Sequence, residues 1–249
     1  YVQKYIILIS KSQIKLIRSL QQKKYRSKLK LFVAEGPKVI NELLSAKFKL
    51  HSLYATVEDL FAGVNSEIIS DEEISKISFL KNANNSVAVF TIPEQKKPKK
   101  EGITLLLDSI RDPGNLGTII RLSDWFNVSN IICSSDSVDC FNPKVVQATM
   151  GSISRVSISY CDLTKYLSLN DLPVYAGTMD GKNIYKEKLP ENAIVIVGNE
   201  ANGISDTLLN LTTHKIGIPR FGNNHQTESL NVAAATAILF SEFKRFTEL

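Results

Sequence analysis

The chain has few of the residues that build metal centres or disulfide frameworks. Its 249 residues include only three cysteines and three histidines. The cysteines form no Cys-x-x-Cys pair and the histidines lack metal-ligand spacing, so we expect no bound metal. An odd number of thiols without a framework favours reduced, buried cysteines in a cytoplasmic protein. The residues concerned are Cys133, Cys140, Cys161, His51, His214 and His225.

Long apolar runs and several familiar catalytic signatures are also missing. No run approaches the roughly 20 apolar residues that a helix needs to cross a bilayer. Residues 1–10 are too short for a signal peptide and lack a cleavage site. The patterns GxGxxG, GxxxxGKS/T, HExxH and GxSxG do not occur. Their absence argues against a dinucleotide enzyme, a P-loop NTPase, a zinc protease and an α/β-hydrolase.

Acidic residues are scarce at the N-terminal end. Residues 1–50 hold twelve Lys or Arg against Glu35 and Glu42, a local charge of +10, although the whole chain carries +5. A basic surface with an interleaved aromatic, Tyr25, is typical of binding to a polyanion such as RNA. A solvated surface without a partner is the alternative. The residues predicted to contact RNA are Lys23, Lys24, Arg26, Lys28 and Lys30.

A charged stretch broken by Pro98 divides the chain. We predict a small, basic α/β domain for RNA binding over residues 1–95, a linker over 96–102 and a larger α/β domain over 103–249. In the first domain, the apolar spacing predicts helices over 12–21, 37–46 and 71–78, and strands over 31–35, 50–57 and 86–92.

Apolar strands alternate with helices in the second domain. The predicted strands cover residues 103–108, 130–134, 156–159, 174–178, 193–197 and 215–218. The predicted helices cover residues 115–126, 143–151, 206–211 and 230–245. This alternation predicts a mostly parallel sheet that is covered by helices on both faces. Ligands of such sheets bind outside the carboxyl ends of the strands.

Three loops follow predicted strands and carry polar side chains. In the first loop, an Asp-Pro-Gly turn precedes Asn115, which we place at a helix start, and Arg121 follows in an apolar stretch. A partly buried Arg121 would need an anionic partner, either a carboxylate or a phosphate. Asn115 as a plain helix cap is the alternative to a functional role.

The second and third loops have a similar composition. Residues 198–203 contain Gly198, where a ligand could approach the backbone closely, and Glu200, which could pair with Arg121, bind a ligand hydroxyl or cap a turn. In the third loop, Ser229 and Asn231 stand where helix N-caps belong. We predict that the three loops converge on one site.

These segments resemble the three motifs of the SpoU (TrmH) family of RNA 2′-O-ribose methyltransferases in the SPOUT superfamily. The segments are DPGNLGTIIR, GNEANGIS and IPRFGNNHQTESLNVA, in the family's order and approximate spacing, and the resemblance covers 103–249. More loosely, FVAEGPKVINELL resembles the small RNA-binding domain that precedes the catalytic domain in rRNA-modifying members.

The resemblance implies a fold and a reaction. The family fold ends in a deep trefoil knot. Members of the family act as homodimers through the knot domain, and they transfer a methyl group from S-adenosylmethionine without a metal. The implied substrate is a ribose 2′-OH of RNA, with 23S-type rRNA favoured over tRNA by family analogy. A tRNA enzyme, an RNA-binding member without activity and a small-molecule enzyme with a nucleotide cofactor remain alternatives.

The resemblance also implies roles for residues. The catalytic positions map to Asn115, Arg121, Glu200, Ser229 and Asn231, and the donor-binding positions map to Thr178, Gly198, Ile218 and Leu230. In the family proposal Arg121 accepts the ribose proton. A guanidinium stays protonated in proteins, so positioning a phosphate and stabilising an alkoxide is the alternative role.

Two positions depart from the family pattern. The stretch between Pro219 and Glu228 is longer than usual, which bears on the donor contact of Leu230. Asn127 stands where Gly is usual, and we expect little consequence because Asn tolerates a left-handed backbone.

Overall fold

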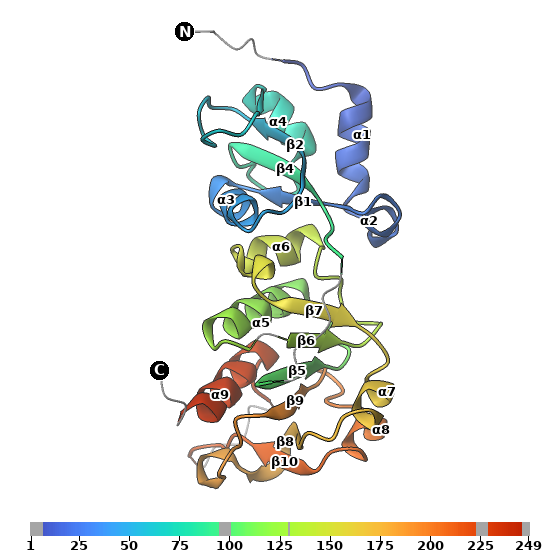
Figure 1. Cartoon of the computed structure of the whole chain (residues 1–249), viewed down its shortest axis with the longest axis vertical. Coiled ribbons are helices and arrows are strands. Elements are labelled where there is room, and N and C mark those ends of the chain that lie inside the picture. The colour runs from blue at the N-terminus through green and yellow to red at the C-terminus, as the bar shows by residue number, and fades with distance from the viewer. Residues whose placement is uncertain (1–6, 95–100, 129, 223–228, 246–249) are drawn as a thin grey trace. The chain divides into compact units, whose positions relative to one another are not determined.

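The computed structural model describes residues 7–94, 101–128, 130–222 and 229–245. The chain forms two compact units (Figure 1). One unit comprises Tyr1–Glu94 and Asp139–Ser154, and the other comprises Gln95–Val138 and Arg155–Leu249. Most of the predicted linker, residues 96–100, lies outside the described residues. None of the described helices is long and apolar enough to span a membrane.

The first unit is built on a four-stranded sheet with the order β1-β4-β2-β3. β4 pairs antiparallel with β1 and β2, whereas β2 and β3 are parallel. The strands are β1 Leu31–Glu35, β2 Leu50–Ala55, β3 Glu67–Ile68 and β4 Ser86–Thr91. The helices are α1 Lys11–Ser19, α2 Lys23–Leu29, α3 Pro37–Ser45 and α4 Asp71–Ile77. The predicted elements are thus confirmed to within a few residues, but α2 and β3 were not expected.

Segment Asp139–Ser154 belongs to this first unit by its packing. It contains α6 (Pro143–Thr149) and the short 3-10 helix η1 (Ser152–Ser154). The Phe141 ring lies 4.7 Å from the Phe32 ring of β1, centroid to centroid. The continuous boundaries predicted from the sequence did not anticipate this grouping, because the aromatic contact joins residues that are far apart in the chain.

The second unit is a six-stranded parallel sheet with the order β10-β8-β9-β5-β6-β7. The strands are β5 Ile103–Leu107, β6 Asn130–Cys133, β7 Ser157–Tyr160, β8 Val174–Asn183, β9 Ala193–Val197 and β10 His214–Gly217. All residues of β5 and β9 are buried, as expected for central strands with helices on both faces. The predicted parallel α/β architecture is confirmed.

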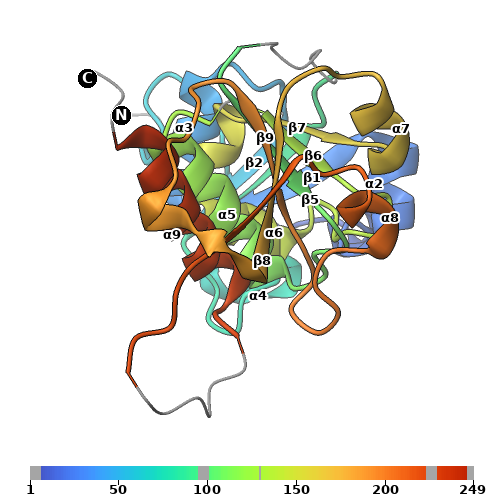
Figure 2. The same ribbon diagram turned by 90° about the horizontal axis from the view of Figure 1, so that it is seen from below.

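Helices cover both faces of this sheet. They are α5 Pro113–Trp125, α7 Leu163–Ser168, α8 Asp206–Leu209 and α9 Val232–Lys244, and a short 3-10 helix η2 spans Ile184–Lys186. Figures 1 and 2 show α5 and α9 together on one face and α7 and α8 on the other. The Phe126 and Phe240 rings, 6.0 Å apart, join α9 to the end of α5. Asn127 has a φ of 51°, so the expectation that Asn serves in place of Gly there is confirmed.

Two glycines allow β8 and β10 to approach backbone to backbone. A Cβ on Gly181 would lie 2.3 Å from the carbonyl carbon of Ile216, and one on Gly217 would lie 2.8 Å from the carbonyl oxygen of Thr178. The register of β10 against β8 also shifts between Lys215 and Ile216. The predicted trefoil knot depends on how the chain is threaded after β10. Because residues 223–228 lie outside the described part, the knot stays a prediction.

Candidate active site

The first loop starts helix α5 with a capping aspartate. The Asp112 carboxylate accepts a hydrogen bond from the backbone N–H of Asn115 at 2.8 Å and is the N-cap of the helix. The alternative in which Asn115 is a plain helix cap is therefore wrong, because the helix begins two residues earlier at Pro113. The Asn115 side chain is consequently available for contacts with other loops.

Asn115 joins the second and third loops through its side-chain amide. Its Nδ2 donates to the Glu200 carboxylate, and its Oδ1 accepts from Asn231 Nδ2 at 2.9 Å. These pairs are 85 and 116 residues apart in the sequence. The prediction that the three loops converge is confirmed by this hydrogen-bonded chain, which we call the Asn231–Asn115–Glu200 chain.

The side-chain amides of Asn115 and Asn231 are each held in one orientation by the groups around them. Asn231 is the N-cap of α9, and its Oδ1 accepts from the backbone N–H groups of Ala233 and Ala234 at 3.0 and 3.3 Å. Backbone N–H groups only donate, so Asn231 Nδ2 must point to Asn115. The ionised carboxylate of Glu200 only accepts, so Asn115 Nδ2 must point to it. The three residues therefore hold each other in one arrangement.

Arg121 is exposed on α5, between the buried side chains of Ile120 and Ser123 along the helix. Among the described residues it has no hydrogen bond or ion pair. The expectation that Arg121 is partly buried is wrong, because this position faces away from the core. Of the two anionic partners considered, no carboxylate of the described residues pairs with it, and phosphate stays a prediction. Glu200 is also exposed and is bonded to Asn115. The Arg121 guanidinium is thus accessible to an external anion.

Ser229 and Leu230 precede α9 and are exposed, Leu230 to 50%. The Ser229 hydroxyl makes no hydrogen bond to the part of the chain that the structure describes. Of the two predicted caps, only Asn231 caps the helix, because α9 starts at Val232. Ser229 therefore stands apart from the Asn231–Asn115–Glu200 chain.

The second loop folds back on itself. Asn199 and Gly203 exchange backbone hydrogen bonds of 3.0 and 2.8 Å. A Cβ on Gly198 would lie 2.2 Å from the carbonyl carbon of Gly203 and 2.4 Å from the nitrogen of Ile204. Only glycine fits at this position. The loop thus presents exposed backbone directly after the buried strand β9.

Three of the four predicted donor-binding residues come from neighbouring strands or the loops after them. Thr178 lies in β8 and Gly198 follows β9, while Ile218 follows β10, and these three strands are adjacent in the sheet. Thr178, Gly198 and Ile218 are each half-buried. Among the described residues no cluster of His, Cys, Asp or Glu has the arrangement of a metal site.

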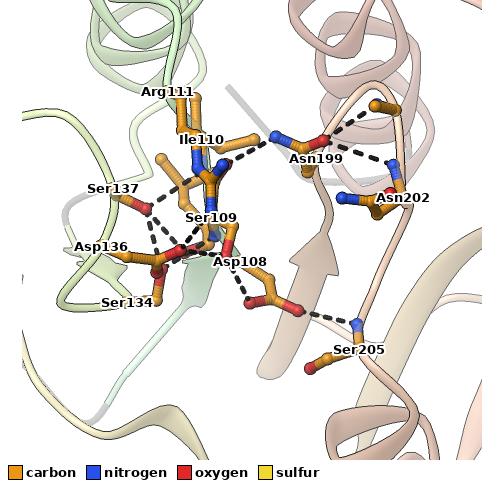
Figure 3. Close-up of polar contacts among 12 residues, drawn as sticks. Asp108, Ser109, Ile110, Arg111, Ser134, Asp136, Ser137, Asn199, Asn202 and Ser205 are labelled. Carbon is orange, nitrogen blue, oxygen red and sulfur yellow. Dashed lines mark hydrogen bonds and ion pairs between the residues drawn. The ribbon is translucent and has the colours of Figure 1, made fainter.

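A polar network behind the site was not predicted from the sequence (Figure 3). It ties the first loop to the second at two points. Asn199 Nδ2 donates to the backbone oxygen of Ser109 at 2.8 Å, and the buried Asp108 accepts from the backbone N–H of Ser205 at 2.8 Å. Ser109 has a φ of 58°, a left-handed backbone that these bonds hold in place.

Asp136 closes the network on the side of β6. It accepts hydrogen bonds from the hydroxyls of Ser109 at 2.6 Å and Ser134 at 2.7 Å. These hydroxyls, with help from Arg111, lower the pKa of Asp136 to about 2. The carboxylate therefore stays ionised at neutral pH. The sequence did contain a signal for this network, because serines and aspartates directly follow the neighbouring strands β5 and β6.

The predicted RNA contacts of the first unit divide into two groups. Lys23, Lys24, Lys28 and Lys30 are exposed, as the prediction requires. Arg26 is only 2% exposed, and its guanidinium forms an ion pair with Asp139 at 2.6 Å. The prediction of an RNA contact is wrong for Arg26. Its partner is 113 residues away in the sequence, so the local charge pattern gave no indication of it.

Comparison with known proteins identifies the family of this chain. A family profile described as the SpoU rRNA Methylase family matches residues 102–241, which include all three loops. The chain belongs to this family. A second profile, described as an MRM3-like substrate binding domain, matches residues 11–88 of the first unit.

Several relatives match almost the whole chain, across both units. The 23S rRNA (guanosine(2553)-2′-O)-methyltransferase RlmP of Bacillus subtilis is 30% identical over 91% of this chain and 94% of its own length. The structure of a TrmH-family protein from Porphyromonas gingivalis matches with a TM-score of 0.86 and 37% identity, covering 96% of this chain and 99% of that one. An AdoMet-bound rRNA methyltransferase from Sinorhizobium meliloti matches with a TM-score of 0.86 and 28% identity, covering 98% and 99%.

Proposed function

We propose that this SpoU family member transfers a methyl group from S-adenosylmethionine to a ribose 2′-OH of ribosomal RNA. The observation that carries the proposal is the Asn231–Asn115–Glu200 chain, which joins all three family motifs in one place. The accessible Arg121 lies on the same helix as Asn115. An RNA-binding protein without activity would not need to maintain this arrangement.

The donor site is formed by backbone of the second and third motifs. The compact turn at Gly198, which only glycine allows, leaves exposed backbone after β9 that is available to the donor. In this proposal, backbone at Thr178, Gly198, Ile218 and Leu230 holds the donor. The AdoMet-bound relative supports the choice of donor. The sulfonium of the donor supplies an electrophilic methyl group, so the reaction requires no metal.

Arg121 acts on the RNA. Its planar guanidinium binds the phosphate next to the target ribose through two parallel hydrogen bonds. In that position it also stabilises the negative charge that develops on the 2′-oxygen as the hydroxyl passes its proton to water. The oxygen attacks the methyl carbon, the S–CH3 bond breaks and S-adenosylhomocysteine leaves. Asn115 fixes the Glu200 carboxylate, and Ser229 supplies a hydroxyl at the opening of the site.

Separate observations bear on the RNA substrate and on the assembly. The named relatives include an enzyme of 23S rRNA, and the first unit is basic, so rRNA is favoured over tRNA. The apolar helix α9 leaves Ala234 exposed, and Trp125 at the end of α5 is 85% exposed. These residues support a homodimer through the second unit. The proposed cytoplasmic location rests separately on the similarity to an rRNA-modifying enzyme.

Labelled methyl transfer tests the substrate. The full chain is incubated with labelled S-adenosylmethionine and either unmodified ribosomal RNA or unmodified tRNA. We expect label in ribosomal RNA and little in tRNA. Label in tRNA alone would show that tRNA, and not ribosomal RNA, is the substrate. Donor binding without transfer to either RNA would favour the alternative of an inactive RNA-binding protein.

The substitution Asn231→Asp tests the role of Asn231 in the reaction separately from its role as the N-cap of α9. The new carboxylate still caps α9, but it cannot donate to Asn115. If Asn115 turns its amide to donate to that carboxylate, its oxygen then faces Glu200, so one contact is unfavourable in either orientation. We expect about tenfold or greater loss of turnover, since a hydrogen bond to a charged group contributes about 1.5–3 kcal/mol.

Thermal unfolding provides the control for this prediction. Asn231→Asp should unfold close to the wild-type temperature, whereas Asn231→Ala should lose about 1 kcal/mol because the cap is removed. Turnover of Asn231→Asp equal to wild type would show that the Asn231–Asn115–Glu200 chain has no part in the reaction.

A further inference from the structure

The first unit has a groove between α1 and α2 that the proposed reaction leaves unexplained. It has a volume of about 600 Å³ and is lined by side chains of both helices. Leu16, Tyr25 and Leu29 supply an apolar surface, and Tyr25 and Leu29 are exposed to 36% and 39%. Apolar side chains gathered in a hollow offer a surface to the apolar face of a ligand. Figure 1 shows the two helices that form the groove.

Positive charge surrounds this apolar surface. Lys15, Arg18 and Lys28 line the groove, and residues 1–34 contain no acidic residue. Arg18 is held in place by the backbone oxygen of Ser78 at 3.0 Å. Lys15 and Lys28 are exposed and make no ion pair with the described residues. Both ammonium groups are thus available to an anionic ligand.

The groove is formed before any ligand binds. The buried Arg26 guanidinium donates to the backbone oxygens of Leu20 and Gln21, both at 2.8 Å, in the turn that connects α1 to α2. Its ion pair with Asp139 fixes the same side chain from the other side. Arg26 therefore sets the angle between the helices. A preformed groove binds with less loss of conformational entropy.

We propose that this groove binds one unpaired RNA base together with its flanking phosphates. The proposal rests on the RNA substrate of the proposed function and deepens it. An extruded base offers a flat apolar face that can stack on the Tyr25 ring and pack against Leu16 and Leu29. The flanking phosphates pair with Lys15 and Lys28. A paired duplex presents only backbone to the groove and leaves its apolar surface uncovered.

The chemistry favours RNA over a protein partner. Lys24 Nζ lies 6.0 Å from the centroid of the Tyr25 ring, so the aromatic surface itself has a cation beside it. An apolar peptide would have to cover several cations without neutralising them. An RNA segment supplies a stacking face and a negative charge at each nucleotide.

Fluorescence anisotropy with two RNA probes tests the proposal. The full chain is titrated with an RNA hairpin that has an unpaired loop and with a fully paired duplex of equal length. For Tyr25→Ala, we expect about a tenfold loss of affinity for the hairpin and no change for the duplex, in keeping with the cost of losing one stacked base. Tyr25→Phe should bind both RNAs like wild type, because it keeps the ring.

Lysine variants test the phosphate contacts. The double variant Lys15→Gln, Lys28→Gln should bind the hairpin more weakly and lower the slope of log affinity against log salt by about 1.4, or about 0.7 for each phosphate contact. Lys38→Gln is the matched control, because Lys38 is exposed on α3 and does not line the groove. Its affinity and its salt slope should be those of wild type.

The outcomes separate this proposal from the proposed function. If wild type and Tyr25→Ala bind the hairpin with equal affinity, the proposed role of the groove is wrong, even where methyl transfer proceeds. Loss of hairpin affinity in Tyr25→Ala supports the groove, even where wild type transfers no methyl group. Equal losses on hairpin and duplex would mean that the groove does not recognise an unpaired base. If an acidic apolar peptide displaced the RNA and Tyr25→Ala bound RNA with wild-type affinity, the ligand of the groove would be a protein and not RNA.

Discussion

Arg121→Ala is expected to abolish methyl transfer and to leave the fold intact. Arg121 is exposed and makes no ion pair with the described residues, so its removal breaks no structural contact there. Removing one preorganised donor for a developing oxyanion lowers turnover by about 100-fold to 1,000-fold. An exposed substitution of this kind changes stability by about 0.5 kcal/mol or less. Single-turnover transfer and thermal unfolding measure the two effects.

Two further variants make the Arg121 result specific. Arg121→Lys keeps the charge but loses the planar fork, so we expect it to remain strongly impaired. Lys165→Ala removes an exposed cation from α7, on the opposite face of the sheet, and should transfer at the wild-type rate. Donor affinity should be unchanged in all three. Wild-type turnover in Arg121→Ala would remove this residue from the mechanism.

Gly198→Ala is expected to disrupt the donor site and to destabilise the second unit. The added methyl group would lie 2.2 Å from the carbonyl carbon of Gly203, so the loop after β9 has to open. Forcing an atom into a filled space costs about 1–3 kcal/mol, and here the obstacle is backbone. We expect loss of S-adenosylmethionine binding in calorimetry and a lower unfolding temperature.

Gly177→Ala is the matched control for the Gly198 prediction. Its added methyl group would meet the Leu239 side chain at 3.1 Å and the backbone oxygen of Ile196 at 3.4 Å, so the clash is much milder than at Gly198. We expect a small change in stability and unchanged donor affinity. Wild-type donor affinity in a folded Gly198→Ala protein would mean that the donor binds away from this loop.

The convergence of the three motifs could be predicted from the sequence for a simple geometrical reason. The carboxyl ends of parallel strands meet at one edge of the sheet, so loops after such strands lie near each other. The strand over residues 193–197 was predicted with its observed bounds. Local apolar patterns suffice for these features, because strand and helix periods are properties of neighbouring residues.

Two features that the sequence did not predict correctly depend on contacts between residues distant in the sequence. Arg26 was predicted to bind RNA because it lies in a basic run, yet its partner is Asp139. The network of Asp108, Ser109 and Asp136 joins loops that only the sheet brings together. A local pattern records which residues alternate between core and solvent, but it does not record which buried polar groups will meet.

The grouping of Asp139–Ser154 with the first unit affects how RNA binding should be studied. Deleting residues 1–95 would remove the surroundings of Phe141 and the partner of Asp139. A loss of RNA binding could then result from misfolding. Point substitutions in the full chain avoid this problem because they leave the packing of both segments in place.

Alkaline hydrolysis of the methylated RNA tests the central claim most directly. Alkali cleaves RNA through the free 2′-OH, so a 2′-O-methyl group protects a single linkage. After incubation of the full chain with S-adenosylmethionine and unmodified ribosomal RNA, the account predicts one protected linkage with wild type and none with Arg121→Ala. Transferred label without any protected linkage would place the methyl group on a base and would contradict ribose 2′-O-methylation.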